Sequence, residues 1–230
     1  ICSDKTGTLT QNKMTVVDYY AQDQDLLAAG MALCCDAELK TTETGEEVVG
    51  EPTEAALVAY ASVQNMPKPG LVKMFPRIGE APFDSGRKMM STVHRNTEMD
   101  APAEIDTELD ELIAKSEFVQ FTKGAPDVVL RHSEYILTQE GIKPMTEELA
   151  ESVRRANARM AGKALRVLSL AARGHHKRPD DFSPEALEQE LIFIGLVGMI
   201  DPIRPEVKDA VAECRTAGIR PIMITGDQLD

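Results

Sequence analysis

The chain has 230 residues, 43% of them hydrophobic, which is enough apolar side chain to fill the core of one large domain or two small ones. Its formal net charge of -13 argues against nucleic acid and anionic lipid as partners, because their phosphates require clustered Lys and Arg. The longest apolar stretch, residues 191–200, is about half of the roughly 20 residues that a membrane-spanning helix needs. We therefore expect a soluble globular chain with no membrane span and no signal peptide.

The 4 cysteines and 4 histidines form no pattern typical of a metal site or a disulfide framework. No C-x-x-C pair occurs in the sequence, and no histidine stands at ligand spacing from a cysteine, so we expect free thiols in a reducing compartment. The adjacent His175 and His176 lie in a polar, basic stretch. This context favours a solvated turn there over a zinc site.

The first ten residues, ICSDKTGTLT, place a carboxylate after a short apolar run and follow it with a lysine, hydroxyls and a glycine. A carboxylate attacks a terminal phosphoryl group only if a cation, turn amides and hydroxyl donors converge on the same oxygens. Asp4 is the candidate nucleophile, and Lys5, Thr6, Gly7 and Thr8 supply these groups, except for the rest of a magnesium shell. An ordinary Asx or Gly turn would not explain the lysine and the threonines in this register.

The elements that follow are predicted from periodicity and from turn residues. Apolar residues at helical spacing, or a proline in a first turn, predict helices over residues 23–38, 52–65, 125–131, 146–161 and 206–216. Strands are predicted over residues 1–4, 88–94, 117–123, 165–172, 191–199 and 219–225, with a short hairpin arm at 46–49. Residues 68–82 should be irregular or form short edge strands, and 98–111 should be an acidic loop leading into a helix.

Four segments in the middle of the chain hold candidate ligand-binding residues. Phe83 has polar neighbours that leave one ring face free for stacking, although a core phenylalanine beside a basic turn remains the alternative. Lys123 and Gly124 can line a pocket for a flat ligand or form a plain strand-to-helix turn. Arg166 interrupts an apolar strand, where its guanidinium can bind phosphate or form a strand-edge salt bridge. Taken alone, Glu54 is explained by capping and by the favourable interaction of an acidic side chain with a helix N-terminus.

The string DKTGTLT resembles the signature of the P-type cation-transporting ATPases, whose pumps pass through a phosphorylated aspartate. The later motifs resemble those of the same family in the same order, over nearly the whole chain. GEPTEAAL at 50–57 is similar to the box whose second acid, here Glu54, accepts a hydrogen bond from the adenine amino group. KGAPD is similar to KGAPE, and LRVLSLA to the pattern that assigns Arg166 to phosphate. FDSGRKMMS fits the family pattern at Phe83, Arg87 and Lys88, but Ser85 stands where many calcium pumps carry an arginine.

The resemblance also implies hinges and the roles of the end segments. DPIRP at 201–205 resembles the family hinge, and residues 10–14 are the first linker. Thr6 replaces the acid/base aspartate of related soluble phosphatases, which favours a long-lived phosphoenzyme. The implied catalytic residues are Asp4, Lys5 and Thr6, with Asp4 and Thr6 on magnesium. Nucleotide contacts are implied for Glu54, Phe83, Arg87, Lys88, Lys123, Gly124 and Arg166, and contacts to the arriving phosphoryl group for Thr225, Gly226 and Asp227.

The implied fold class is α/β. Residues 191–199, 206–216 and 219–225 read as a βαβ unit that joins the strand at 1–4 in a parallel sheet, with Asp4 at a carboxyl strand end. The expected architecture is a partial doubly wound, haloacid-dehalogenase-like phosphorylation domain (1–12 and 203–230, truncated). A large α+β nucleotide-binding domain (13–202), built on an antiparallel sheet, is inserted in it. The abrupt ends suggest a piece of a longer protein.

The functional prediction is an ATP-binding fragment from the cytoplasmic side of a P-type cation pump, with calcium as the preferred ion. The expected cofactors are ATP and Mg²⁺, and the expected partners are the remaining phosphorylation, actuator and transmembrane domains of the same pump. The chain lacks the family's G-D-G-x-N-D magnesium segment, so the fragment should bind ATP with little turnover. A nucleotide-binding module without catalytic role and a soluble phosphatase are the competing hypotheses.

Overall fold

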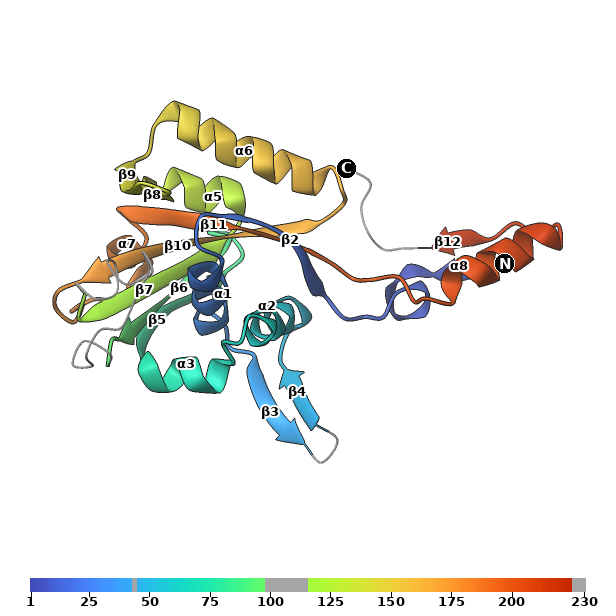
Figure 1. Cartoon of the computed structure of the whole chain (residues 1–230), viewed down its shortest axis with the longest axis horizontal. Helices are drawn as coiled ribbons and strands as arrows, with labels where there is room; N and C mark the ends of the chain where they lie inside the picture. Colours follow the sequence, from blue (N-terminus) through green and yellow to red (C-terminus); the bar gives the residue numbers. More distant parts are fainter. Residues whose placement is uncertain (43–44, 98–115, 225–230) are drawn as a thin grey trace.

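The computed structural model describes residues 1–42, 45–97 and 116–224. Figure 1 shows a main body made of a sheet with helices on both faces, a projecting hairpin, and a narrow extension that holds residues from both ends of the chain. The helices are α1 (Gln24–Leu33), α2 (Pro52–Val63), α3 (Lys68–Met74), α5 (Pro126–Arg131), α6 (Glu147–Ala161), α7 (Pro184–Leu187) and α8 (Val207–Thr216). The strands are β1 (Cys2–Asp4), β2 (Thr15–Ala21), β3 (Glu38–Thr42), β4 (Gly45–Val49), β5 (Arg77–Asp84), β6 (Met89–Arg95), β7 (Phe118–Gly124), β8 (Ser133–Thr138), β9 (Gly141–Pro144), β10 (Arg166–His175), β11 (Leu191–Ile200) and β12 (Ile222–Ile224).

The large sheet has the strand order β5-β6-β7-β10-β11-β8-β9, with β2 also paired to β11. Every pairing in it is antiparallel except β8 with β11, so the sheet is mixed. The predicted antiparallel pairing of the strands at 88–94 and 117–123 is confirmed as β6 with β7. The predicted hairpin arm is the antiparallel pair β3 and β4.

Two apolar layers bury the two faces of this sheet. Helices α1, α2 and α3 cover one face, and α5 and α6 cover the other (Figure 1). Helix α1 is buried on all sides, from Leu26 to Leu33, because it lies between the sheet and its neighbouring helices. A Cβ at Gly30 would lie 2.6 Å from Leu170 Cδ2 and 2.7 Å from Phe121 Cδ1, so glycine permits this close helix-to-sheet contact.

Capping side chains set the helix starts that the sequence predicts. The Asp23 carboxylate accepts a hydrogen bond from the Leu26 amide, and the Thr146 hydroxyl accepts one from the Leu149 amide. Helix α2 starts at Pro52, the first-turn position that tolerates a missing N–H. The predicted helix over 23–38 ends early, at Leu33, because the carbonyls after it bond to side chains from other elements.

One prediction of secondary structure is partly confirmed and another is wrong. Residues 77–82 form most of β5, an edge strand as predicted, but residues 68–74 form helix α3 instead of irregular structure. Pro69 lies in the first turn of α3, where proline does not break a helix. The predicted βαβ unit is absent from the described residues, because β11 is a central strand of the large sheet while β12 pairs with β1. Strand β11 is apolar because helices cover both faces of its sheet, and β12 is exposed rather than buried. The predicted loop at 98–111 lies outside the described residues.

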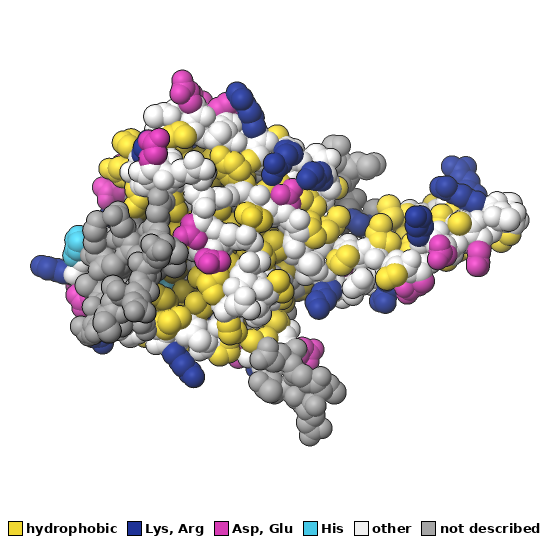
Figure 2. Space-filling view, in the orientation of Figure 1, with side chains coloured by type: hydrophobic (Ala, Val, Ile, Leu, Met, Phe, Trp, Pro, Cys, Tyr) yellow, Lys and Arg dark blue, Asp and Glu magenta, His cyan; other side chains and the backbone are white. Residues whose placement is uncertain are grey.

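The extension contains β1, an irregular turn at Lys5–Leu9, α8 and β12 (Figure 1). Strands β1 and β12 pair in parallel, as predicted, with Asp4 opposite Ile224. Apolar side chains are visible along the extension in Figure 2. Ile1, Ile203 and Met223 are 64%, 65% and 57% exposed. No helix of the described residues has the length and hydropathy needed to cross a membrane.

Candidate functional site

Glu54 and Lys123 form an ion pair at one end of the large sheet. Lys123 is the next-to-last residue of β7, Glu54 lies in the first turn of α2, and the lysine Nζ donates to Glu54 Oε1. Glu54 Oε2 accepts hydrogen bonds from the Asp36 amide at 2.7 Å and the Ala37 amide at 3.1 Å. Lys123 Nζ also lies 3.2 Å from Cys35 Sγ. The side chains of Lys123 and Glu54 are 8% and 17% exposed, so the pair is largely desolvated.

Burial and charge act against each other in this pair. Burial raises the pKa of Glu54, but the ammonium of Lys123 and the two amides outweigh it, so the pKa lies below 4.5. For Lys123, burial lowers the pKa, and the acidic groups of Cys35, Cys34 and Glu54 more than offset it, so the pKa is raised. Burial also raises the pKa of Cys35 to about 12, so Glu54 is the anionic partner at neutral pH. The ion pair is therefore fully charged at pH 7.

Gly124 ends β7 directly before α5, so it lies in the strand-to-helix turn that the sequence offers as one of two interpretations. A Cβ on Gly124 would lie 2.5 Å from Met89 Cβ and 2.6 Å from the Lys88 carbonyl oxygen. The Ala125 amide donates to the same Lys88 carbonyl at 3.0 Å. Glycine is thus required because β7 and the turn before β6 approach closely, and this contact places Lys88 beside the end of β7. Lys88 itself has a φ of 57°, in the left-handed region.

Phe83 lies in β5, and its ring is exposed, as the sequence predicts; the residue is 62% exposed. The turn after it is closed by Asp84, whose Oδ1 accepts from the Gly86 and Arg87 amides at 3.0 and 2.9 Å. Asp84 pairs with Met89, and Met89 pairs with Gly124 across the sheet. The register therefore brings Phe83, Lys88 and Gly124 to the same end of the sheet as the ion pair.

The Arg87 guanidinium is held by protein groups. Nη1 donates to Oε1 and Oε2 of Glu188 at 3.1 and 3.3 Å, and Nη2 donates to the Pro82 carbonyl at 2.6 Å. The Glu188 side chain is 4% exposed, and its burial raises the pKa while Arg87 opposes the rise. Sequence patterns gave no sign of Glu188, which follows α7 and meets Arg87 only in the folded chain. Arg87 therefore anchors the turn that carries Phe83.

Replacing Arg87 by alanine should destabilise the main body by about 2 kcal/mol, because the carboxylate of Glu188 would stay buried without its cation. The measurement is the urea midpoint of unfolding at pH 7. The control is Arg131→Ala, which removes an arginine from the pair with Asp127, where both side chains are about two-thirds exposed (66% and 65%), and should change little. Equal midpoints for Arg87→Ala and the wild type would contradict a structural role for this pair.

Arg166 is the first residue of β10 and is exposed, not enclosed in an apolar strand. Its NH1 donates to the Thr53 hydroxyl at 2.7 Å, and that hydroxyl donates to Glu51 Oε1 at 3.0 Å. Because Thr53 precedes Glu54 in α2, this contact places the guanidinium next to the ion pair. Arg166 keeps further N–H donors, since a guanidinium has five in all.

Asp4 lies in the extension, at the carboxyl end of β1, and it is exposed. Gly7 has a φ of 78° in the turn that follows, a conformation that favours glycine. The Gly7 amide donates to the Thr10 hydroxyl at 3.3 Å, and that hydroxyl donates to Asp201 Oδ2 at 2.5 Å. Arg204 NH2 donates to the Gly7 carbonyl at 3.2 Å. Asp201 and Arg204 therefore hold the turn after Asp4.

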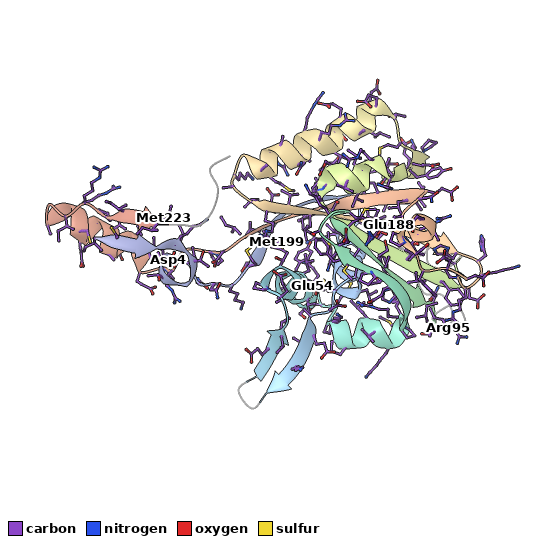
Figure 3. The ribbon with its side chains drawn as sticks, turned by 180° about the vertical axis from the view of Figure 1, so that it is seen from behind. Asp4, Glu54, Arg95, Glu188, Met199 and Met223 are labelled. Atoms are coloured by element: carbon purple, nitrogen blue, oxygen red, sulfur yellow. The ribbon has the colours of Figure 1, made fainter. Side chains whose placement is uncertain are left out.

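The two linkers run side by side between the extension and the main body. Thr10 and Ile203 form an antiparallel bridge, and the Gln11 amide donates to the Pro202 carbonyl at 3.0 Å. Figure 3 shows Asp4 in the extension and Glu54 in the main body, on opposite sides of these linkers. Thr225, Gly226 and Asp227 lie outside the described residues. The structure thus brings the predicted nucleotide residues together and separates them from the predicted nucleophile.

The donor set around Asp4 fits magnesium in part. The exposed carboxylate of Asp4 and the carbonyl of Thr6 are oxygen ligands of the kind that magnesium prefers. Among the described residues, no group of three or more His, Cys, Asp and Glu side chains is placed to hold a metal ion. Asp4 and Thr6 would therefore hold a magnesium ion that is bound mainly through the phosphates of a nucleotide and through water.

The remaining cysteine and histidine predictions have mixed outcomes. All four cysteines are free, as expected, and Cys34 and Cys35 are buried. The prediction of a solvated turn is wrong for His175, which lies in β10 with Nε2 3.0 Å from Gln120 Oε1. Burial, and then the charge of Arg173, lowers the pKa of His175 to about 4.

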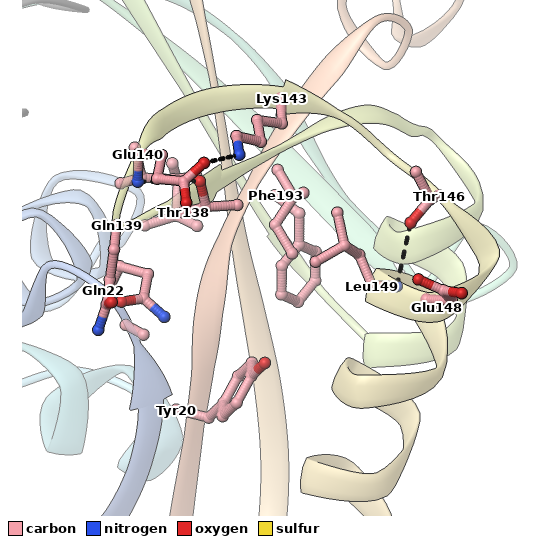
Figure 4. Close-up of a pocket in the computed structure, with 14 residues that line it drawn as sticks. Tyr20, Gln22, Thr138, Gln139, Glu140, Lys143, Thr146, Glu148, Leu149 and Phe193 are labelled. Carbon is pink, nitrogen blue, oxygen red and sulfur yellow. Dashed lines mark hydrogen bonds and ion pairs between the residues drawn. The ribbon is translucent and has the colours of Figure 1, made fainter.

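Two pockets of the described residues lie away from Phe83 and Arg166. One, of about 450 Å³, opens where β2 and β8 separate along β11, and Figure 4 shows Phe193 and Leu149 at its apolar side. Glu140 and Lys143 form an ion pair at its rim, and Glu148 also lines it. The other pocket, of about 510 Å³, is lined by Cys35, Lys68 and Arg77 among others. It adjoins the amides that bind Glu54.

Comparison with known proteins identifies the family of the chain. The family described as P-type ATPase, cytoplasmic domain N, matches residues 23–206. The chain is 43% identical over 244 residues to calcium-transporting ATPase 1 of Bacillus cereus, an alignment that covers 100% of the chain and 25% of that protein. It is 38% identical over 245 residues to a calcium-transporting ATPase of Listeria monocytogenes (99% and 25%). It is 31% identical over 264 residues to the sodium/potassium-transporting ATPase subunit alpha-1 of Oreochromis mossambicus (99% and 24%).

The matched region contains the strands of the large sheet except β2, and it contains Glu54 and Lys123. The chain therefore belongs to the P-type ATPase family and contains its cytoplasmic domain N, which confirms the family resemblance of the motifs. It spans about a quarter of the length of these relatives.

Proposed function

We propose that the main body binds ATP and that Asp4 accepts its terminal phosphoryl group in the intact pump. The observation that carries the proposal is the gathering of Glu54, Phe83, Lys123 and Arg166 from four separate segments at one end of the sheet. An aromatic face, a carboxylate and two cations are the groups that a purine, its amino group and a phosphate chain require. The ligand class therefore follows from these side chains.

Each residue has a role that its surroundings support. Glu54 keeps lone pairs beyond those used by Lys123 and two amides, so it can accept a hydrogen bond from the adenine amino group. Phe83 stacks on the base with its exposed ring, and Lys88 and Arg166 take the phosphates. Lys123 holds Glu54 in place and lends positive charge to the pocket.

The phosphoryl transfer step requires the main body to swing about the linkers, because Asp4 and the ion pair lie in different parts of the molecule. Asp4 then attacks the terminal phosphorus, and the leaving group is ADP. Magnesium bound with ATP supplies charge neutralisation on the phosphate oxygens. Lys5 and the hydroxyl of Thr6 offset the remaining charge. We propose calcium as the transported ion, because the relatives that cover this chain include calcium-transporting ATPases.

The remaining parts of the pump complete this function. We propose that the rest of the phosphorylation domain, an actuator domain and membrane-spanning helices are the partners of the chain, since it spans a quarter of its relatives. The domain limits 1–12, 13–202 and 203–230 stay a prediction, in line with the linkers near residues 10–13 and 201–204. The exposed apolar side chains of the extension provide a surface for the missing part of that domain.

Replacing Phe83 by alanine should weaken ATP binding to this chain by about 5- to 150-fold, the equivalent of about 1–3 kcal/mol of base stacking. The measurement is isothermal titration calorimetry with ATP and magnesium. Tyr135→Ala is the matched control, because it removes another exposed ring, 39% exposed, from strand β8. An unchanged ATP affinity in Phe83→Ala would contradict the proposal that adenine stacks on Phe83.

A phosphate-ester assay distinguishes the competing functions. A soluble phosphatase would release phosphate from small esters with this chain alone, whereas the proposed fragment should show almost none. Brisk magnesium-dependent release would therefore overturn the proposal in favour of a phosphatase.

A further inference from the structure

Two cations outside the proposed site, Lys68 and Arg77, bind the segment that follows α1. Lys68 Nζ donates to the carbonyls of Cys35 at 2.6 Å and Ala37 at 2.7 Å. Arg77 NH2 donates to the carbonyls of Leu33 at 3.0 Å and Cys35 at 2.6 Å. We call residues 33–37 the relay segment. Its carbonyls thus receive four hydrogen bonds from two side chains that come from α3 and β5.

The other side of the relay segment faces the ion pair. The amides of Asp36 and Ala37 donate to Glu54 Oε2, and Cys35 Sγ contacts the ammonium of Lys123. The Cys35 carbonyl and the Asp36 amide belong to one planar peptide unit, so the hydrogen bonds that fix this carbonyl also fix the direction of the Asp36 amide. The Ala37 amide belongs to the next unit, which lies between the two carbonyls that Lys68 holds. The position of the Glu54 carboxylate therefore depends on groups that never touch it.

Lys68 is unusual because it is a buried lysine whose ammonium donates to two backbone carbonyls. It is 8% exposed, and burial lowers its pKa, so its ammonium is held there at a cost in free energy. Arg77 is fixed as well, because NH1 donates to Asp36 at 2.8 Å and Glu80 at 2.7 Å.

We infer that Lys68 and Arg77 are positioning residues for the adenine end of the nucleotide site. By holding the Cys35 carbonyl, they direct the Asp36 amide at Glu54. Lys68 also holds the Ala37 carbonyl, which restricts the peptide unit that carries the Ala37 amide, and the two amides together fix the Glu54 carboxylate for the adenine amino group. This inference rests on the proposed function. It predicts that both residues govern the choice between purines, because a carboxylate accepts from the 6-amino group of adenine and repels the 6-oxo group of hypoxanthine.

The experiment measures dissociation constants for ATP and for ITP, with magnesium, by calorimetry on this chain. Lys68→Met and Arg77→Met should each weaken ATP binding about tenfold, the scale of one hydrogen bond to a charged group, while ITP binding changes much less. The preference for ATP over ITP should therefore fall. Lys68→Arg should keep more of this preference than Lys68→Met does, because arginine keeps the positive charge and the N–H donors. Lys73→Met is the control, since Lys73 is an exposed lysine on the same helix.

The outcomes separate the inference from the proposed function. Failure of the wild-type chain to bind ATP would overturn the proposed function itself. Equal binding of ATP and ITP by the wild type would overturn the inference, because Glu54 would not read the amino group. An unchanged ratio of the ATP and ITP dissociation constants in Lys68→Met and Arg77→Met would also overturn the inference. This includes the case in which both variants lose affinity for ATP and ITP by the same factor. Should Lys68→Met not fold, Arg77→Met decides, since the Arg77 side chain is 26% exposed and less deeply placed.

Discussion

Replacing Asp4 by asparagine should abolish phosphorylation of the intact pump by the terminal phosphate of ATP. Asparagine keeps the shape of the side chain but presents a neutral amide, which is not a nucleophile for phosphorus, so labelling should fall by several powers of ten. The measurement is acid-quenched incorporation of labelled γ-phosphate, with hydroxylamine used to release an acyl phosphate. ATP binding should persist in the variant, because the nucleotide residues lie in the main body.

Asp25→Asn is the matched control for this prediction. Asp25 is an exposed carboxylate in the first turn of α1, so the change in charge is the same and the phosphorylation site is untouched. Its labelling should equal that of the wild type. If Asp4→Asn retained hydroxylamine-sensitive label, another residue would be the acceptor, and the chain would be a binding module with a silent Asp4.

Replacing Lys123 by methionine should destabilise the main body by about 4 kcal/mol at pH 7, because it leaves the largely buried carboxylate of Glu54 without its cation. ATP binding should weaken as well, since Lys123 holds Glu54 in position. The stability loss is measured as the shift in the urea midpoint relative to the wild type. Lys143→Met is the control, since Lys143 pairs with Glu140 where the side chains are 43% and 76% exposed, and the midpoint should hardly move.

The same variant has a defined pH dependence. The pKa of Glu54 is lowered in the folded chain, so the pair stabilises fully above the ordinary value of 4.5 and is lost as pH falls through the lowered pKa. In Lys123→Met the buried Glu54 carboxyl has no cation beside it, so it takes up a proton more readily as the pH falls, and protonation removes the cost of its unpaired charge. The stability difference between wild type and variant should therefore be largest near pH 7 and shrink below pH 4.5. A difference that stays constant from pH 7 to pH 4 would contradict the ion pair.

The candidate site was largely predictable as a set of residues but not as a set of roles. Motifs identified Glu54, Phe83 and Lys123, and the fold brings them to one end of a sheet. The same motifs assign Arg87 to the nucleotide, whereas its guanidinium holds Glu188 and the Phe83 turn. Gly124 likewise makes room for the backbone of a neighbouring strand. A motif states which residues occur together and cannot state what each of them touches.

Lys68 and Arg77 were missed for a physical reason. Each stands near a proline in a stretch of mixed polarity, which predicts irregular structure, and their partners are backbone carbonyls that leave no trace in the residue type. The large sheet was misjudged in a similar way. A continuous apolar strand such as β11 is buried on both faces, but its composition does not tell which sheet buries it.

The sequence by itself determined the individual elements and the chemistry available. Caps such as Asp23 and Thr146 and the first-turn Pro52 act over a few residues, so they can be read locally. Only the tertiary structure decided which strands share a sheet and which charges meet. Glu54 and Lys123 are 69 residues apart, and Arg87 and Glu188 are 101 apart. Such pairs exist because burial of the sheet between two helical layers brings distant segments together, and no local pattern encodes that packing.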